Sequence, residues 1–85
     1  IIYIATFKLI ENIDISHNEL IVIKYVYFDF KNSIKFLNLS HNQIEFVEKK
    51  AFDNLNQIVI LDLSFNKIIK LHHQYFGTVE YLYIN

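Results

Sequence analysis

The chain has 85 residues, of which 53% are hydrophobic, and its formal net charge is -1. This length allows one domain or a segment of a larger one, and the apolar fraction is ample for a core. The small net charge and the absence of Arg among the eight basic residues favour neither nucleic acid nor an anionic membrane as partner. Because there is no Cys, disulfides and thiolate metal sites are excluded within this segment.

Residues 1–9 open the chain with an apolar stretch. It has no basic region and no small-residue cleavage site, so we do not interpret it as a signal peptide. Ile4 and Phe7 match Phe52 and Leu55 of a later unit, and the stretch is therefore expected to be part of a coil. No apolar run in the sequence approaches the ~18 residues of a transmembrane helix, which argues against direct membrane insertion.

An internal repeat organises the rest of the sequence. Asn18, Asn42 and Asn66 follow one another at intervals of 24 residues, and the apolar positions around them keep the same step. Each unit matches the pattern L-x-x-L-x-L-x-x-N-x-L, most clearly as IVILDLSFNKI at residues 58–68. The chain is therefore interpreted as one repeat segment, with a partial coil at 1–9, units at about 10–33, 34–57 and 58–78, and a partial repeat at 79–85.

This pattern resembles the leucine-rich repeat family, in the 24-residue type common in extracellular receptors such as Toll-like receptors. The resemblance implies an α/β solenoid, an open horseshoe segment with short parallel strands on its concave face and turns or short helices on its convex face. It further implies protein–protein recognition within a receptor, adhesion or innate-immune protein. The implied location is extracellular or on the cell surface, with a cytoplasmic location left open.

Each unit is expected to contain a short strand, at 13–15, 37–39 and 61–63, with two apolar side chains inward and one residue outward between them. In the last coil a 24-residue step would bury Asn85, whereas a 21-residue step turns Leu82 and Ile84 inward. An unpaired buried amide costs roughly 1–3 kcal/mol, so we expect the shorter step. The predicted buried ladders are Ile13-Leu37-Leu61-Leu82, Ile15-Leu39-Leu63-Ile84, Leu20-Ile44-Ile68, Ile23-Val47-Leu71 and Phe28-Phe52-Phe76.

An Asn follows each strand at the point where the backbone turns inward. Its amide has two donors and an acceptor, enough to bond backbone groups of its own and adjacent coils. Asn18, Asn42 and Asn66 are therefore predicted to be structural. Of the return segments, residues 48–55 contain good helix formers and are predicted to be the more helical. Residues 24–30 are aromatic and β-branched, and are predicted to be irregular or extended.

The outward strand positions carry the candidate binding site. They are polar in the N-terminal half of the face and apolar in the C-terminal half, and a contiguous exposed apolar patch is typical of an interaction site. Tyr and Phe are favoured anchors at interfaces. The alternatives are that other parts of the parent protein cover the patch, or that these coils are a structural spacer. The predicted protein-binding residues are Asp14, Phe36, Asn38, Ile60, Asp62, Phe65, Tyr81 and Tyr83.

His17 and His41 hold equivalent positions in adjacent units, ~5 Å apart if the strands pair. Two imidazoles this close could respond to pH by mutual repulsion, or provide two metal ligands. No third ligand aligns with them, because Phe65 holds the next equivalent position. SHN is also a usual filler in the family that the chain resembles, so we assign no metal or cofactor. His72 and His73 are assigned no site.

Nothing in the sequence indicates catalysis, and we predict that the segment is not an enzyme. Ser16, Ser40 and Ser64 recur with the coil, as structural turn residues would, and no acid/base or phosphate-binding motif appears. Asn38 lies in an N-x-[ST] pattern, a possible glycosylation site if the protein enters the secretory pathway. No capping unit is visible at either end, so the isolated chain is expected to self-associate through its open core.

Overall fold

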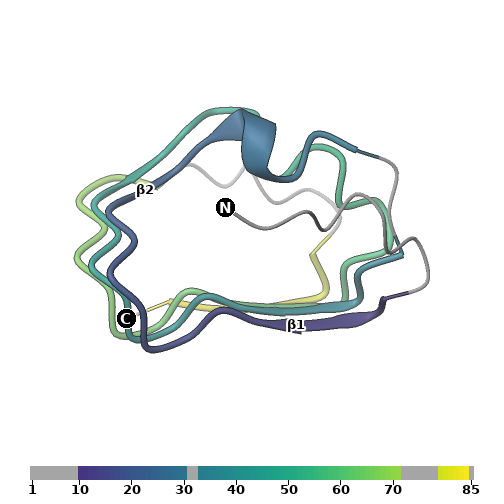
Figure 1. Ribbon diagram of the computed structural model, residues 1–85, viewed down its shortest axis with the longest axis horizontal. Coiled ribbons are helices and arrows are strands. Elements are labelled where there is room, and N and C mark those ends of the chain that lie inside the picture. Colours follow the sequence, from purple (N-terminus) through teal and green to yellow (C-terminus); the bar gives the residue numbers. More distant parts are fainter. Residues whose placement is uncertain (1–9, 31–32, 72–78, 85) are drawn as a thin grey trace.

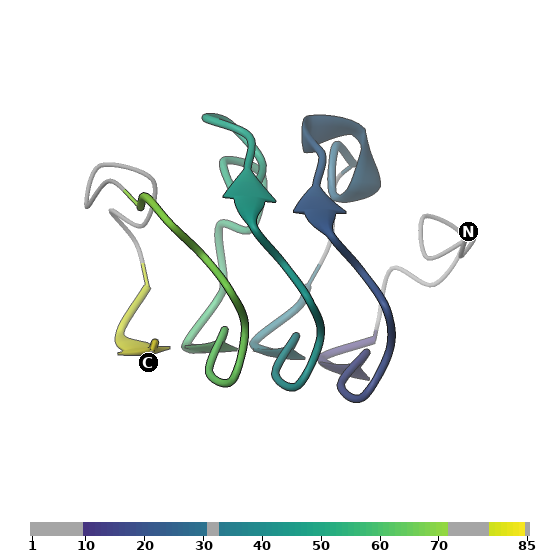
Figure 2. The same cartoon turned by 90° about the vertical axis from the view of Figure 1, so that its left-hand side faces the viewer.

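The computed structural model describes residues 10–30, 33–71 and 79–84. Within them, a parallel sheet contains β1 (Asn12–Asp14), β3 (Phe36–Asn38), β5 (Ile60–Asp62) and β6 (Tyr81–Tyr83), in that order. A second parallel sheet pairs β2 (Val22–Ile23) with β4 (Phe46–Val47), and Tyr25–Tyr27 forms the 3₁₀ helix η2. The chain alternates between the two sides, so that successive coils superimpose in Figure 1 and lie side by side in Figure 2.

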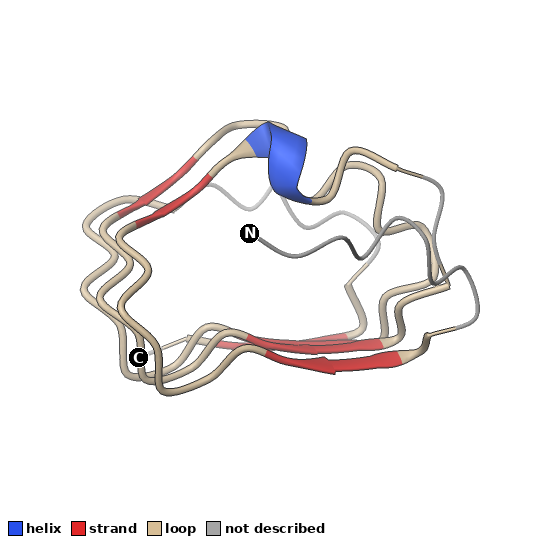
Figure 3. Cartoon of the chain, viewed as in Figure 1, coloured by secondary structure: helices blue, strands red, loops and turns tan. Residues whose placement is uncertain are grey.

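Strand pairing follows the sequence repeat. Leu37 lies opposite both Ile13 and Leu61, and Leu61 lies opposite Leu82, which confirms the 21-residue step predicted for the last coil. The strands, drawn red in Figure 3, begin one residue earlier than predicted. The reason is that the N–H groups of Phe36 and Ile60 already donate to carbonyls of the preceding coil.

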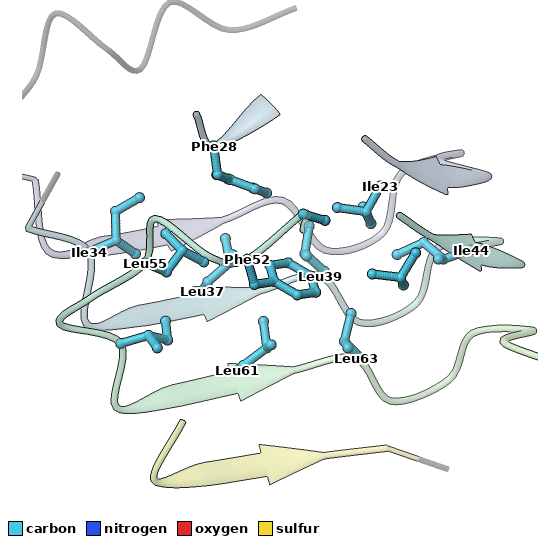
Figure 4. Close-up of a cluster of buried hydrophobic side chains, with 13 residues drawn as sticks. Ile23, Phe28, Ile34, Leu37, Leu39, Ile44, Phe52, Leu55, Leu61 and Leu63 are labelled. Carbon is cyan, nitrogen blue, oxygen red and sulfur yellow. The ribbon is translucent and has the colours of Figure 1, made fainter. Parts of the chain in front are cut away.

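The core lies inside the coils, between the two sheets. Leu37, Leu39, Leu61 and Leu63 are fully buried, and Figure 4 shows them directed away from the strands toward the opposite side of the coil. Their inward direction follows from the alternation of side chains along a strand. The stacking of coils then covers each of them from both sides.

The aromatic ladder behind the sheet is present where the structure describes it. The ring centroids of Phe28 and Phe52 are 6.1 Å apart with the planes inclined by 31°, a tilted contact within the range of favourable aromatic pairs. Phe76, predicted as the third member, lies outside the described residues. Ile84 was predicted to be buried and is 45% exposed, because it lies in the outermost described coil and packs against a neighbour on one side.

The first return segment contains the helix that was predicted for the second. The N–H of Tyr27 donates to the carbonyl of Lys24 and closes η2, and the N–H of Tyr25 donates to Glu48 Oε1 at 2.6 Å. A single 3₁₀ turn needs only one such i→i+3 bond, so aromatic and β-branched residues are no obstacle to it. The expectation of an irregular segment at residues 24–30 was wrong in this respect.

Residues 48–55, predicted to be the more helical segment, form successive turns. The N–H groups of Ala51, Asp53 and Leu55 each donate to the carbonyl three residues earlier. Ala51, Phe52 and Leu55 are all buried, and turning these three inward takes precedence over the local helix propensity.

Candidate functional site

The outward side chains of the four-stranded sheet form one surface, which we call the sheet face. Strand register aligns them in two rows across the strands. A hollow of about 280 Å³ lies over β1, β3 and β5, lined by residues that include Phe36, Ile60, Asn38 and Asp62. The first row consists of Asn12, Phe36, Ile60 and Tyr81, and the second of Asp14, Asn38, Asp62 and Tyr83.

The structure brings most of the predicted apolar residues together. The strand register places Phe36 on β3 opposite Ile60 on β5, and Ile60 opposite Tyr81 on β6. Phe36 is 40% exposed, Tyr81 51% and Tyr83 50%, whereas Ile60 is half-buried. Phe65 is also exposed, but it lies in the turn after β5, outside both rows. The apolar patch therefore centres on the last three strands, and Phe65 is separate from it.

The polar residues of the second row have a structural task that sequence reasoning missed. Asn38 Oδ1 accepts hydrogen bonds from Ser40 N at 3.0 Å and Ser40 Oγ at 2.7 Å. The same pair of bonds joins Asp14 to Ser16 and Asp62 to Ser64. These are Asx-type turns, and the recurring D/N-x-S spacing was the signal for them. Since a carboxylate has two oxygens, each Asp has a second one to offer a partner.

The turn also affects the charge of Asp14. The hydroxyl of Ser16, then its N–H and, more weakly, His17 lower the pKa of the Asp14 carboxyl below its ordinary value. All three favour the carboxylate, because hydrogen-bond donors and nearby positive charge stabilise the anion. Asp14 is therefore a stable negative charge on the exposed surface at neutral pH.

Asn38, the possible glycosylation site, lies within β3 in the middle of the sheet. Ser40, the third residue of its sequon, is 5% exposed and bonded to Asn38. A glycosylation acceptor usually lies in a surface loop, so the folded geometry does not favour attachment here.

Asn42 and Asn66, two of the repeated Asn residues, join adjacent coils. Asn42 is buried, its Nδ2 donates to the carbonyls of Ile15, Leu39 and Ser40, and its Oδ1 accepts from Leu20 N. Asn66 makes the corresponding four bonds one coil later. Asn18 is exposed and donates within its own coil, to Ile15 and Ser16. The amide therefore satisfies backbone groups that turn toward the core, which is a structural role.

Three planar side chains stack along the turns that follow the strands. His17, His41 and Phe65 have φ of 58°, 54° and 55°, left-handed values that are uncommon outside Gly and in which His is enriched. Successive ring centroids are 4.3 Å apart and the planes are within 10° of parallel. The shared position and planar side chains were the sequence signal for this stack.

The stacked arrangement of the two histidines does not favour metal binding. Their rings lie face to face, an arrangement that does not direct two nitrogens at one ion. Within the described ranges, no group of three or more His, Cys, Asp or Glu side chains could hold a metal. His72 and His73 lie outside the described residues.

Comparison with known proteins agrees with this geometry. The profile of the leucine rich repeat family matches residues 8–68, which is most of the chain, and the protein belongs to that family. Domains of the family generally bind other proteins and are typically not enzymes. No curated protein and no solved structure matches the chain. In the part of the chain that the structure describes, no helix is both long and apolar enough to cross a membrane.

Proposed function

We propose that the sheet face is a protein-binding surface within a longer leucine-rich repeat array, an open horseshoe solenoid with this face on its concave side. The observation that carries the proposal is the row of Phe36, Ile60 and Tyr81, with Tyr83 beside it. Three of these four side chains are 40–51% exposed. Exposed aromatic rings grouped on one surface are characteristic of interaction sites.

The position of these residues also suits recognition. Phe36, Tyr81 and Tyr83 project from strands that are tied to their neighbours by backbone hydrogen bonds. A side chain on a regular element loses less conformational freedom on binding than one on a mobile loop. The second row adds polar groups next to the anchors, through Asp14, Asn38 and Asp62, which would contribute specificity.

The biological setting that we propose follows from the type of repeat. The 24-residue repeat type supports a receptor, adhesion or innate-immune protein that is extracellular or at the cell surface. The alternative is that these coils are a spacer and that the binding site lies elsewhere in the parent protein.

The proposal is tested by selecting binders to the chain from a displayed peptide library and comparing variants. Phe36→Ser combined with Tyr81→Ser should weaken the selected peptides by about tenfold or more, as expected for loss of interface anchors. Circular dichroism should be unchanged, since both side chains project outward.

Phe46→Ser is the matched control. Phe46 is also a strand Phe and is 59% exposed, but it lies on β4, in the other sheet. It should have no effect on the selected peptides. Equal affinity of the wild type and the double variant would contradict the proposal and favour the spacer.

A further inference from the structure

The sheet face has a one-sided charge. Among the eight side chains of its two rows, Asp14 and Asp62 are acidic and none is basic. Glu11, Lys35 and Glu80 each lie immediately before a strand of this sheet. Lys35 Nζ lies 3.7 Å from Glu11 Oε2, so its charge is already paired. The two rows therefore carry two negative charges and no positive charge. Among the other described residues, six Lys and seven acidic residues nearly balance.

The acidic and aromatic side chains are neighbours. Asp62 lies directly opposite Tyr83 in the pairing of β5 with β6. The face of an aromatic ring attracts a cation, and a carboxylate forms a charge-assisted hydrogen bond with one. A ring next to a carboxylate therefore suits an ammonium or guanidinium group, and opposes an anionic partner such as a nucleic acid or an acidic membrane.

We propose, resting on the protein-binding role above, that the partner of the sheet face is a protein segment in which Lys or Arg side chains flank apolar ones. The cations lie over Asp14, Asp62 and Tyr83, and the apolar side chains lie over Phe36, Ile60 and Tyr81. The two rows are two residues apart along each strand, about 6.6 Å. One extended or helical segment can therefore contact both rows at once.

The chain supplies an isosteric way to remove the charge. Asn38 holds Ser40 with the same pair of bonds that Asp62 makes with Ser64, at 3.0 and 2.7 Å against 3.0 and 2.6 Å. Asp14→Asn and Asp62→Asn therefore keep the acceptor oxygen and the turn while removing two negative charges. Asp53→Asn is the matched control. Asp53 is an exposed carboxylate in the turns of residues 48–55, on the return side of the coil, away from the sheet face.

The probes are three short labelled peptides, of alternating Arg and Leu, alternating Glu and Leu, and alternating Arg and Ser. Fluorescence anisotropy should show binding of the Arg-Leu peptide alone, weakened at high salt. The Asp14→Asn, Asp62→Asn double variant should weaken it by about tenfold, since each substitution removes a carboxylate that would pair with a cation of the peptide. The Asp53→Asn variant should bind like the wild type.

The outcomes separate this inference from the proposed function. Equal binding of the Arg-Leu and Glu-Leu peptides to the wild-type chain would overturn the cationic preference, whatever the variants do. If library-selected peptides still depended on Phe36 and Tyr81, the protein-binding role would stand without it. Sedimentation of the chain alone tests a second copy as occupant. A dimer dispersed by the Phe36→Ser, Tyr81→Ser variant would assign the face to self-association and overturn the inference.

Discussion

The two sides of each coil obey the same 24-residue period and differ in how closely they repeat. On the sheet side, three successive coils have the same Ser turn and a residue with positive φ at the same repeat position. Two of these coils also have the same four hydrogen bonds of the repeated Asn. On the return side, one coil forms a 3₁₀ helix and the next a series of turns. The local structure therefore repeats closely on the sheet side of each coil and varies on the return side.

The difference has a physical cause. After each strand the backbone turns into the core, and its N–H and C=O groups must find partners there because water is excluded. Only a side chain such as Asn at one position can supply them. On the return side the requirement is weaker, namely that Ile23 and Val47, or Phe28 and Phe52, reach the core. The path between such contacts can differ from coil to coil.

The largest expected effect is at the buried Asn. Asn42→Ala would leave the carbonyls of Ile15 and Leu39 and the N–H of Leu20 without this partner. We expect a loss of about 3 kcal/mol or more in the free energy of unfolding, since each unpaired buried group costs roughly 1–3 kcal/mol. Denaturant titration measures it.

Asn18→Ala provides the internal comparison for that substitution. Asn18 occupies the same repeat position but is exposed, so water can replace its bonds, and the loss should be about 1 kcal/mol or less. Equal losses at the two positions would show that bonding between coils is not what makes the Asn necessary.

The next largest effect on stability is expected at His41, which has a left-handed backbone conformation between β3 and Asn42. His41→Ala and His41→Gly both remove the ring that stacks on His17 and Phe65, but only Gly accepts a φ of 54° without steric cost. The Gly variant should be the more stable of the two by about 1 kcal/mol. Thermal unfolding of both variants measures the difference.

Lys49 on the return side is the control for this order. Lys49 is exposed, and it is not one of the described residues that have a positive φ. The Lys49→Ala variant should therefore be more stable than the Lys49→Gly variant. If Ala matched or exceeded Gly at position 41 as well, the left-handed backbone would not be a source of strain.

The difference between the sheet side and the return side also explains which features of the structure could be predicted from the sequence. Strand pairing, the short last step and the inward Leu residues were predictable because each depends on a position that recurs. The outward direction of Phe36 and Tyr81 followed from the same register. The turn role of the repeated Ser residues was also predicted from their recurrence, and the hydrogen bonds to Asp14, Asn38 and Asp62 agree with it. The acceptor role of these three residues and the stacking of the rings were not predicted, although both follow from recurring positions.

The return side was not predictable in this way. Helix propensity favoured residues 48–55, and the helix formed at Tyr25–Tyr27. At this helix Tyr25 N donates to Glu48 Oε1, 23 residues away in the sequence, and no local pattern indicates such a contact. The exposure of Ile84 likewise depends on what lies beside it in the stack.

The smallest effects concern pH, and they take opposite signs on the two sides. The hydrogen bonds of Ser16 lower the pKa of Asp14 in the folded chain from its ordinary 3.8. Its contribution to stability is therefore full above pH 3.8 and lost as the pH falls through the folded pKa. Asp14→Asn, which keeps the turn and does not titrate, should flatten the acid limb of the unfolding free energy against pH. An unchanged limb would mean that the Ser16 bonds do not favour the carboxylate.

On the return side the corresponding group is Tyr25, whose hydroxyl donates to Asp29 Oδ1 at 2.9 Å. This bond, and then the charge of Asp29, raise the pKa of Tyr25 from its ordinary 10.0. The contribution is full below pH 10.0 and lost as the pH rises through the folded pKa. Tyr25→Phe should flatten the alkaline limb only slightly, because the pair is exposed. Asp29 keeps its bond from Asn54 Nδ2 at 2.7 Å, so the two coils remain joined. A change at Tyr25→Phe larger than that at Asp14→Asn would therefore mean that the return side depends on specific side-chain bonds as much as the sheet side does.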